Sequence, residues 1–357
     1  MGSGRSRQKN SSSRERIVTK RFNDKDIHFY TINNRSSDPI DYQGGFRKIV
    51  ALSDKYDFDG ILCFSANETM VDPWLAAHFL IQNSRRLVPI VAVNPVYMHP
   101  FSAAKMVSSF AYLHGRRTIL NLITGASARD RSVLNDSIGH NERYARLGEY
   151  SEIMQMLLSD GTSRSFQGNY YNLEDAVLSP CLELEMKPEF LVAGHSAAAT
   201  ELADRVNAVR LRMLSSDFSV ETPGPSGVGL HLGVIAAETD EKAREIAKNR
   251  FPSNPELEGM LDYLMEENDS IWKKKLFEKL NANENKAAEF WLEPFRLMKS
   301  DCPYIVGSFD RVAEIMTHQI ASGIDRFIFD MPPIEDDFQQ ITHCINLAFE
   351  KLNTVAA

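Results

Sequence analysis

Short apolar runs alternate with amphipathic segments along most of the chain from residue 26 onward. The runs DIHFYTI (26–32), GILCFSA (60–66), VPIVAVNP (88–95) and RTILNLITG (117–125) are each followed by a stretch with helical spacing. Consecutive apolar positions are typical of strands buried on both faces, and a helix after each strand is typical of a parallel sheet. The first part of the chain therefore predicts four strand–helix units.

The same alternation continues in the second part of the chain. We expect a helix over 140–159, strands over 190–194, 209–214, 227–236 and 326–332, and a final amphipathic helix over 336–352. Eight strand–helix units close a (β/α)8 barrel. Residues 240–300 are helical by composition and separate the seventh strand from the eighth, so we place them as an insertion on the carboxyl face of the barrel. The predicted fold is α/β, a (β/α)8 TIM barrel over residues 23–357 with a helical insertion between strands 7 and 8.

Charge is distributed unevenly along the chain. The whole chain has a net charge of −8, but residues 1–21 carry seven basic side chains against one acid, and the remaining 33 basic and 47 acidic residues give −14. Such an acidic body does not suit nucleic acid, and the polar, Ser-rich residues 1–22 are expected to form a disordered basic tail. No apolar run reaches the roughly 18 residues of a membrane helix, and no signal-peptide pattern is present. We expect a cytoplasmic protein with no membrane contact.

Several common chemistries lack their sequence patterns. The four cysteines lie far apart, and the nine histidines include no HxH or HExxH pair, so we expect no metal site. No G-x-S-x-G elbow of a hydrolase is present. The glycines of GPSGVG (224–229) lead into a strand and not from a strand into a helix, so they form no dinucleotide fingerprint.

The end of the fifth predicted strand, FLVAGHSAAATELADR (190–205), carries more information. Gly194 permits a tight turn, and Ser196 then opens a helix whose first N–H groups have no partner within the helix. This arrangement suits a helix cap and suits a bound phosphate equally well. The fourth strand ends near Thr124, and His140 and Tyr144 lie one turn apart at the start of the next helix. These polar clusters at neighbouring strand ends suit a phosphorylated ligand.

Four segments together resemble the bacterial luciferase-like flavin monooxygenases. They are RTILNLITG (117–125), HNERYARLGEYSEIMQMLLSDG (140–161), SFQGNYYNLEDA (165–176) and PEFLVAGHSAAATELA (188–203), and the resemblance covers about residues 26–237 and 303–350. The similar branch contains alkanesulfonate monooxygenase, nitrilotriacetate-type and dibenzothiophene-sulfone enzymes. The resemblance implies a (β/α)8 barrel that binds reduced flavin mononucleotide (FMNH2) delivered by a separate NAD(P)H:flavin reductase. It further implies activation of O2 as a flavin C4a-peroxide that oxygenates a small organic substrate, in a homodimer or homotetramer.

The resemblance also implies roles for individual residues. Flavin-binding positions of the family fall on Ser65, Thr124, His140, Tyr144, Gly194, His195 and Ser196, with Ser196 and the backbone after Gly194 at the phosphate. His231, in the seventh strand, corresponds to a histidine beside the flavin ring. A histidine there either packs inside the barrel or acts as the catalytic group that stabilises or protonates the activated oxygen.

Departures from the sulfonate branch bear on the substrate. Gly229 stands where the branch has an arginine, Met331 where it has a tyrosine, Met70 near its cysteine, and Met298 or Lys299 near its loop arginine. Because a guanidinium is the group that holds a sulfonate, an alkanesulfonate substrate is not expected. The methionines suggest a softer, more apolar ligand and a specialised role such as secondary metabolism. The alternatives are a coenzyme F420-dependent oxidoreductase and a flavin-binding barrel without catalytic activity.

Overall fold

The computed structural model describes residues 16–67, 69–125, 127–220, 223–266, 268–281 and 288–356. The strands are β1 Arg21–Phe22, β2 Lys25–Asp26, β3 His28–Ile32, β4 Gly60–Cys63, β5 Val88–Val93, β6 Ile119–Leu122, β7 Arg164–Gln167, β8 Asn172–Ala176, β9 Glu189–Ala193, β10 Val209–Met213, β11 Val228–Ala237, β12 Phe290–Trp291, β13 Tyr304–Ser308 and β14 Ile324–Asp330. The α-helices are α1 Pro39–Lys55, α2 Pro73–Asn83, α3 Pro100–His114, α4 Ala128–Val133, α5 His140–Leu157, α6 Ala197–Arg205, α7 Asp240–Arg250, α8 Pro255–Glu266, α9 Ile271–Asn281, α10 Glu293–Arg296, α11 Phe309–Ala321 and α12 Glu335–Ala356.

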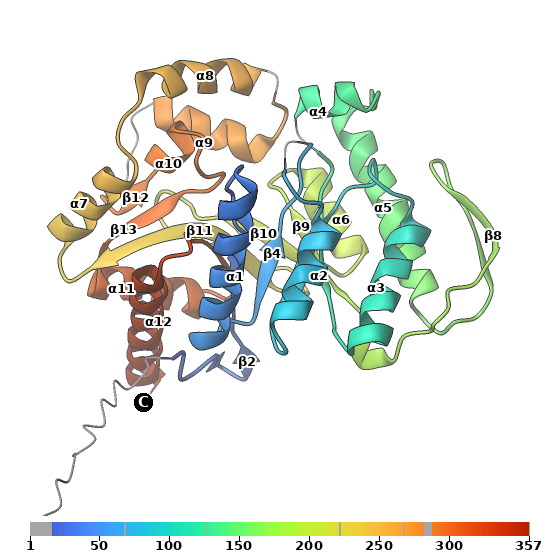
Figure 1. Cartoon of the computed structure of the whole chain (residues 1–357), viewed down its shortest axis with the longest axis horizontal. Coiled ribbons are helices and arrows are strands. Elements are labelled where there is room, and N and C mark those ends of the chain that lie inside the picture. The colour runs from blue at the N-terminus through green and yellow to red at the C-terminus, as the bar shows by residue number, and fades with distance from the viewer. Residues whose placement is uncertain are drawn as a thin grey trace, which may run out of the picture.

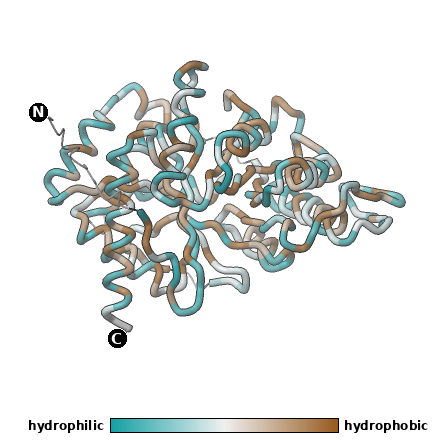
Figure 2. Tube along the Cα trace, turned by 60° about the horizontal axis from the view of Figure 1, so that its bottom comes forward, coloured by the Kyte–Doolittle hydropathy of each residue, from teal (hydrophilic) through white to brown (hydrophobic). Residues whose placement is uncertain are grey.

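Eight parallel strands form a closed barrel, which confirms the predicted fold. Their order is β3, β4, β5, β6, β9, β10, β11 and β14, and β14 pairs back with β3. All eight predicted strands are present. Helices surround the barrel, and α8 and α9 lie together over one end of it (Figure 1). Teal and brown alternate along α12 near the C-terminus in Figure 2, as expected for a helix that buries one face.

The sixth strand–helix unit differs from the prediction. The described residues between β10 and β11 form no helix, so only a loop connects these two strands. The sequence of this connection, SSDFSVETPGPSG, is rich in Ser, Pro and Gly, which favour turns over helix. This unit therefore contributes no helix to the outer side of the barrel, although α6 contacts β10 and α7, α11 and α12 contact β11.

The insertion starts from an unusually long barrel strand. β11 pairs with β10 and β14 over its first half, and its second half, from Gly233 to Ala237, pairs with β13. The sequence did not predict β13 or the short antiparallel strand β12 that pairs with it. α7 packs against this extension and β13, and β12 pairs with β13, so the insertion stands on a strand that is also part of the barrel.

Side-chain caps explain why three of the outer helices begin where they do. The carboxylates of Asp38 and Asp72 accept hydrogen bonds from backbone N–H groups in the first turns of α1 and α2, and His99 does the same for α3. Each cap is followed by proline at the first helical position, where the missing N–H costs nothing. The inner faces of these helices pack on the strands in a continuous apolar core.

The predicted disordered tail, residues 1–22, lies only partly within the described residues. Residues 1–15 lie outside the described residues. Within 16–22, Ile17 is buried in the apolar core, and the Lys20 ammonium lies 3.1 Å from Asp59 Oδ1. This segment therefore packs against the barrel and does not belong to a disordered tail. No helix in the described ranges is long and apolar enough to cross a membrane.

Candidate active site

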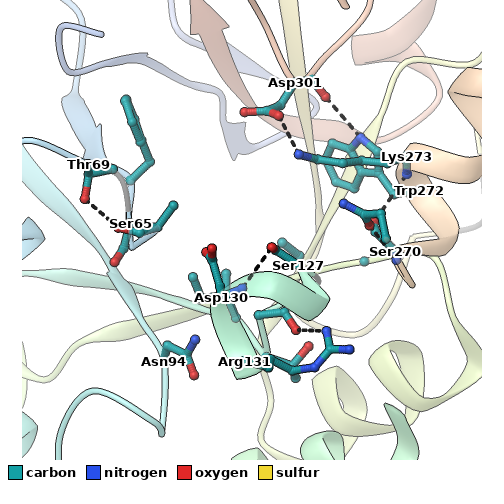
Figure 3. A pocket seen from close by; sticks show the side chains of 18 of the residues that line it. Ser65, Thr69, Asn94, Ser127, Asp130, Arg131, Ser270, Trp272, Lys273 and Asp301 are labelled. Carbon is teal, nitrogen blue, oxygen red and sulfur yellow. Dashed lines mark hydrogen bonds and ion pairs between the residues drawn. The ribbon is translucent and has the colours of Figure 1, made fainter. Parts of the chain in front are cut away.

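A large pocket, which we call the main pocket, lies at the carboxyl ends of the barrel strands. It has a volume of about 620 Å³, within the range typical of ligand and cofactor sites. The loops after β3, β4, β5, β6 and β9 line it, and residues 268–273 and 298–301 of the insertion complete it. Figure 3 shows side chains from both parts pointing into the same space.

All seven residues that the resemblance assigns to flavin binding line this one pocket. They are Ser65, Thr124, His140, Tyr144, Gly194, His195 and Ser196. They come from the segments after three strands, β4, β6 and β9, and from the start of α5, so the closure of the barrel is what brings them together. We call the surface formed by Thr124, Tyr144, Gly194 and Ser196 the barrel wall.

Hydrogen bonds connect the hydroxyl groups of the barrel wall. The Tyr144 hydroxyl hydrogen-bonds with the side chains of Ser196 and Thr124, and burial raises the pKa of Tyr144. The Ser196 hydroxyl also accepts a hydrogen bond of 3.1 Å from Ala199 N and so caps α6. The Tyr144 hydroxyl is therefore neutral at physiological pH and able to donate its proton to an acceptor in the pocket.

Gly194 is required at its position in the barrel wall. Its φ is +145°, which side chains rarely tolerate, and a Cβ atom would lie 2.7 Å from Tyr144 Oη and 3.0 Å from Ala199 Cβ. The Gly194 carbonyl accepts a hydrogen bond from the buried Arg212 guanidinium, which also donates to Thr200 Oγ1 at 3.0 Å. The backbone of the β9–α6 turn is thereby held close to the hydroxyl groups.

His195 and Trp272 form the floor of one side of the pocket. Their rings meet edge to face, with centroids 5.3 Å apart, and His195 Nε2 accepts a hydrogen bond of 3.1 Å from Met213 N. That hydrogen bond places the proton of a neutral His195 ring on Nδ1. His195 is therefore oriented by the backbone of β10 and does not simply face solvent.

His231 lies deeper than the sequence predicted. It is not among the residues that line the pocket; its ring packs behind Trp272, with centroids 6.3 Å apart. Burial lowers its pKa, and its Nε2 has no hydrogen-bond partner among the described residues. Inward-facing strand periodicity indicated that His231 points into the barrel, but it carried no information about the tryptophan that covers it.

His231, Cys302 and Asp330 form a buried cluster in which potential metal ligands lie within 4.8 Å of one another. The sequence spacing did not reveal this cluster because its members lie on β11, next to β13 and on β14. The Asp330 carboxylate already accepts a hydrogen bond of 2.5 Å from Ser300 Oγ and forms an ion pair of 3.3 Å with Arg35. Its charge is thus compensated by a guanidinium, which disfavours a second cation.

The opposite side of the pocket consists of Arg35, Trp272, Lys273 and Asp301, which we call the insertion wall. Asp301 Oδ1 lies 2.7 Å from Lys273 Nζ, and Asp301 Oδ2 lies 3.3 Å from Arg35 NH1 (Figure 3 shows the Lys273 contact). Lys273 holds the pKa of the Asp301 carboxyl well below its ordinary range. Asp301 therefore joins α9 of the insertion to the loop after β3.

A second ion-pair centre anchors the same segment of the insertion. Asp269 Oδ2 lies 2.6 Å from Arg143 on α5 and 3.2 Å from Arg131 on α4. Residues 268–273 are thus held to the barrel at both ends. The sequence analysis missed these partners because they are separated by more than a hundred residues and share no periodic pattern.

Charged side chains line the pocket together with two of the three methionines that the sequence analysis named. Met70 and Met298 do line it, but Met331 is buried and does not, and Arg35, Arg131, Lys273, Asp130 and Asp301 are all part of the lining. This chain lacks the arginines that the sulfonate branch has near Gly229 and Met298, but Arg35 and Arg131 bring guanidinium groups to the pocket from other positions. The pocket therefore combines charged and apolar side chains.

Comparison with known proteins identifies the family. The profile of the luciferase-like monooxygenases matches residues 28–214, more than half of the chain. The chain belongs to this family. A relative from Niallia circulans, 4-(gamma-L-glutamylamino)butanoyl-acyl-carrier-protein monooxygenase BtrO, is 30% identical over 309 residues, which cover 82% of this chain and 87% of the relative.

Solved structures of similar fold agree with this assignment. EDTA monooxygenase from Chelativorans sp. BNC1 has a TM-score of 0.68 at 15% identity, covering 92% of this chain and 94% of that one. The oxygenating component of 3,6-diketocamphane monooxygenase from Pseudomonas putida, in complex with FMN, has a TM-score of 0.63 at 16% identity, covering 90% and 96%. These structures share the fold, and the family match makes this luciferase-like chain an enzyme of the monooxygenase class.

The residues of this luciferase-like barrel fit a flavin phosphate. The absence of a Cβ at Gly194 keeps the backbone close to the hydroxyl groups of Tyr144 and Ser196, and the first turn of α6 supplies N–H groups with no partner inside the helix. A phosphate needs such donors and no carboxylate beside them. Thr124, Tyr144 and Ser196 provide hydroxyl groups only.

Proposed function

We propose that this chain is the oxygenase component of a two-component system that uses reduced FMN and O2 to oxygenate a small organic substrate. The observation that carries the proposal is the convergence of Thr124, Tyr144, Gly194 and Ser196 on one side of the main pocket. When bound, reduced FMN would supply the electrons that activate dioxygen. A separate NAD(P)H:flavin reductase would provide it.

The barrel wall would hold the phosphate. Ser196 and Tyr144 would donate hydroxyl hydrogens to it, and the dipole of α6 would favour its negative charge. His140, whose ring lies 5.1 Å from that of Tyr144, would close the same side. His195, held by Met213 N, would border the cofactor next to the phosphate position.

The insertion wall would exclude water from the reacting centre. Trp272 covers His231 and presents its ring to the pocket, and the ion pairs of Asp269 and Asp301 keep this segment against the barrel. Water exclusion matters because activated oxygen next to a reduced cofactor is lost when water reaches it. His231 would act through Trp272 as a positioning residue and not by touching the substrate.

We infer that the substrate is polar and carries its own charged or amide groups. The insertion wall offers both signs of charge, with Arg35 and Lys273 on one hand and Asp301 on the other. The 30% identical relative acts on an amino-acid-derived acyl group carried by an acyl-carrier protein. An amino-acid-derived acyl group presented as a thioester is the substrate class that agrees with both observations.

Anaerobic titration of the purified protein with reduced FMN, followed by mixing with air-saturated buffer, tests the cofactor assignment. We expect saturable binding and oxygen consumption that is coupled to product when an aminoacyl thioester is present. Failure of reduced FMN to bind would overturn the proposal, and binding of reduced F420 in its place would move the enzyme to the deazaflavin oxidoreductases. FMN binding without any oxygen-dependent product from a panel of such thioesters would contradict the substrate class.

A further inference from the structure

A second, smaller pocket lies behind the floor of the main pocket. It has a volume of about 160 Å³, and His195 and Trp272 line both pockets. Its other walls are β10, the start of β11, the loop after β10, and α9 of the insertion. It occupies the outer side of β10, where the sixth strand–helix unit has a loop in place of a helix.

The charge of this second pocket differs from that of the main pocket. Its lining includes the cations Arg212, Lys275 and Lys279, and no carboxylate is among its described lining residues. Asp217, in the adjoining loop, accepts hydrogen bonds from Ser215 Oγ at 2.6 Å and Ser219 Oγ at 2.7 Å. In the main pocket, by contrast, three aspartates stand beside the cations. The described lining of the second pocket therefore carries basic side chains and no acidic ones.

The helix α9 directs its lysines to different places. Lys273 lines the main pocket, Lys275 lines the second pocket, and Lys274 between them is exposed and lines neither. Trp272, Leu276 and Lys279 recur at helical spacing and line the second pocket together. Lys279 Nζ donates a hydrogen bond of 3.0 Å to the buried Ser216 and lies over the Phe290 ring at 5.7 Å. Its ammonium group is thus held in place beside the pocket.

The interior of the second pocket is apolar. The side chains of Leu214, Val228, Leu230, Leu276 and Ile324 line it, and all five are buried. A volume of about 160 Å³ is several times the space that one water molecule needs, so the pocket has room for a small organic group. An anionic group on a short carbon chain matches both the cations and the apolar interior.

We propose that the second pocket is a binding site for an anionic group, phosphate or carboxylate, carried on a short carbon chain, with Lys275 and Lys279 as its charged contacts and Arg212 behind them. The occupant would also touch Trp272 and His195, the two residues shared with the main pocket. The proposal does not depend on the identity of the cofactor, because no residue of the barrel wall lines this second pocket.

Calorimetric titration of the full-length protein with propyl phosphate at low ionic strength tests the proposal. We expect saturable binding that Lys275→Gln weakens about three- to tenfold and that Lys275→Gln/Lys279→Gln weakens more than tenfold, as for the loss of charge-assisted contacts. Lys279→Arg should retain binding, since it keeps the charge. Butyrate and 1-butanol are the comparison ligands. A higher affinity for butyrate than for propyl phosphate would assign the site to carboxylates. An affinity for uncharged 1-butanol equal to that for propyl phosphate would overturn the role of charge.

Two further variants test whether propyl phosphate binds somewhere other than the second pocket. Lys274→Gln removes the same charge from the same helix without touching either pocket, so an equal loss of affinity there would reduce the effect to general electrostatics and overturn the proposal. Ser196→Asp repels an anion from the main pocket. Binding that Ser196→Asp abolishes and that the lysine variants leave intact would place propyl phosphate in the main pocket. That outcome would also overturn the second site, as would the absence of binding by all probes.

Discussion

The two sides of the main pocket are held by different kinds of interaction. On the barrel wall, a glycine backbone and three hydroxyl side chains meet through hydrogen bonds within and between neighbouring strand–helix units. On the insertion wall, Arg35, Lys273 and Asp301 meet through ion pairs, and Arg35 and Asp301 are 266 residues apart in sequence. The barrel wall therefore has one geometry set by backbone and sterics. The insertion wall has a geometry set by charges that salt and substitution can weaken.

This difference indicates a division of tasks. A site for a constant group, such as a cofactor phosphate, benefits from fixed donors on rigid elements, because preorganised donors need no rearrangement on binding. A site that must admit a substrate and then exclude water benefits from contacts that open and close. The following tests perturb first the barrel wall, then the residues beneath and across from it.

Ser196→Asp should have the largest effect. It places a carboxylate where the phosphate of FMN is proposed to bind, while aspartate preserves the cap of α6. We expect FMN affinity to fall about a hundredfold or more, because two like charges about 4 Å apart near a protein surface repel by several kcal/mol. Fluorescence titration with FMN measures it. Ser127→Asp is the matched control, since Ser127 also lines the pocket and caps a helix. An equal loss of FMN affinity in Ser127→Asp would contradict the placement of the phosphate at Ser196.

Gly194→Ala should disturb the same wall through sterics alone. The new Cβ would lie 2.7 Å from Tyr144 Oη at a backbone φ of +145°. We expect a loss of about 1–3 kcal/mol in the free energy of unfolding, measured by urea denaturation, together with weaker FMN binding. Gly44→Ala in α1 is the control, because nothing lies within 4 Å of its Cβ position. Stability unchanged at Gly194 would show that the barrel wall is less rigid than inferred.

His231→Gln tests the layer beneath Trp272 by its pH dependence. Burial lowers the folded pKa of His231 below its ordinary value of 6.5, so the unfolded chain takes up the proton first as the pH falls. Stability should therefore decrease as the pH falls below 6.5, and His231→Gln should lose less of it, as measured by urea denaturation at pH 7.5 and 5.5. The variant should also slow turnover more than it weakens FMN binding. Identical pH profiles would remove His231 as the titrating group, and an unchanged turnover would leave it a packing role alone.

Asp301→Asn should loosen the insertion wall without altering the barrel wall. Removal of the carboxylate breaks the ion pairs of Asp301 with Lys273 and Arg35, which hold α9 against the barrel. Amide hydrogen exchange in α9 should therefore become several-fold faster, while exchange in α6 stays constant. High salt should act on the wild type in the same direction but less strongly. Asp310→Asn, at an exposed ion pair of 3.5 Å with Lys351, provides the control. Equal exchange in all three proteins would mean that packing and not charge holds α9.

Removal of residues 1–15 should have the smallest effect. We expect unchanged turnover and an unchanged Tm, because the packed segment begins with Ile17. Removal of residues 1–21 should lower the Tm, since it takes away buried Ile17 and the Lys20 contact with Asp59. Thermal denaturation of both truncated proteins distinguishes them. A large loss of activity in the shorter deletion would make the basic segment a working part of the enzyme.

The sequence predicted the barrel because each strand is a local signal. Buried parallel strands read as apolar runs, and their polar ends, such as Thr124 and Gly194-His195-Ser196, fall by geometry at one rim. The eight strands and the pocket position of seven residues could therefore be inferred without any contact information. The family resemblance supplied the roles that local signals leave open.

The insertion wall could not be predicted in this way. Trp272, Lys273 and Asp301 read as ordinary members of a charged, helical stretch, and their importance comes from partners far away in sequence. The depth of His231 depends on Trp272 in the same manner. The Ser-, Pro- and Gly-rich connection after β10 indicated a loop and not a sixth helix. The prediction missed this because it counted eight complete strand–helix units. Long-range ion pairs and covering side chains need the three-dimensional arrangement.

The long strand β11 determines where the insertion can be exchanged between related proteins. Its residues 228–233 pair with strands of the barrel, Gly233 pairs with β13 as well, and residues 234–237 pair only with β13. If the exchanged segment began at Gly233 and ended before β13, the second half of β11 would come from the donor and β13 from the host. Their hydrogen-bond registers would then not match. Boundaries after Ala237 and before Tyr304 keep the shared pairing intact and replace only what rests on it. In a chimera designed with those boundaries, the substrate side should become interchangeable while the host keeps its own cofactor site.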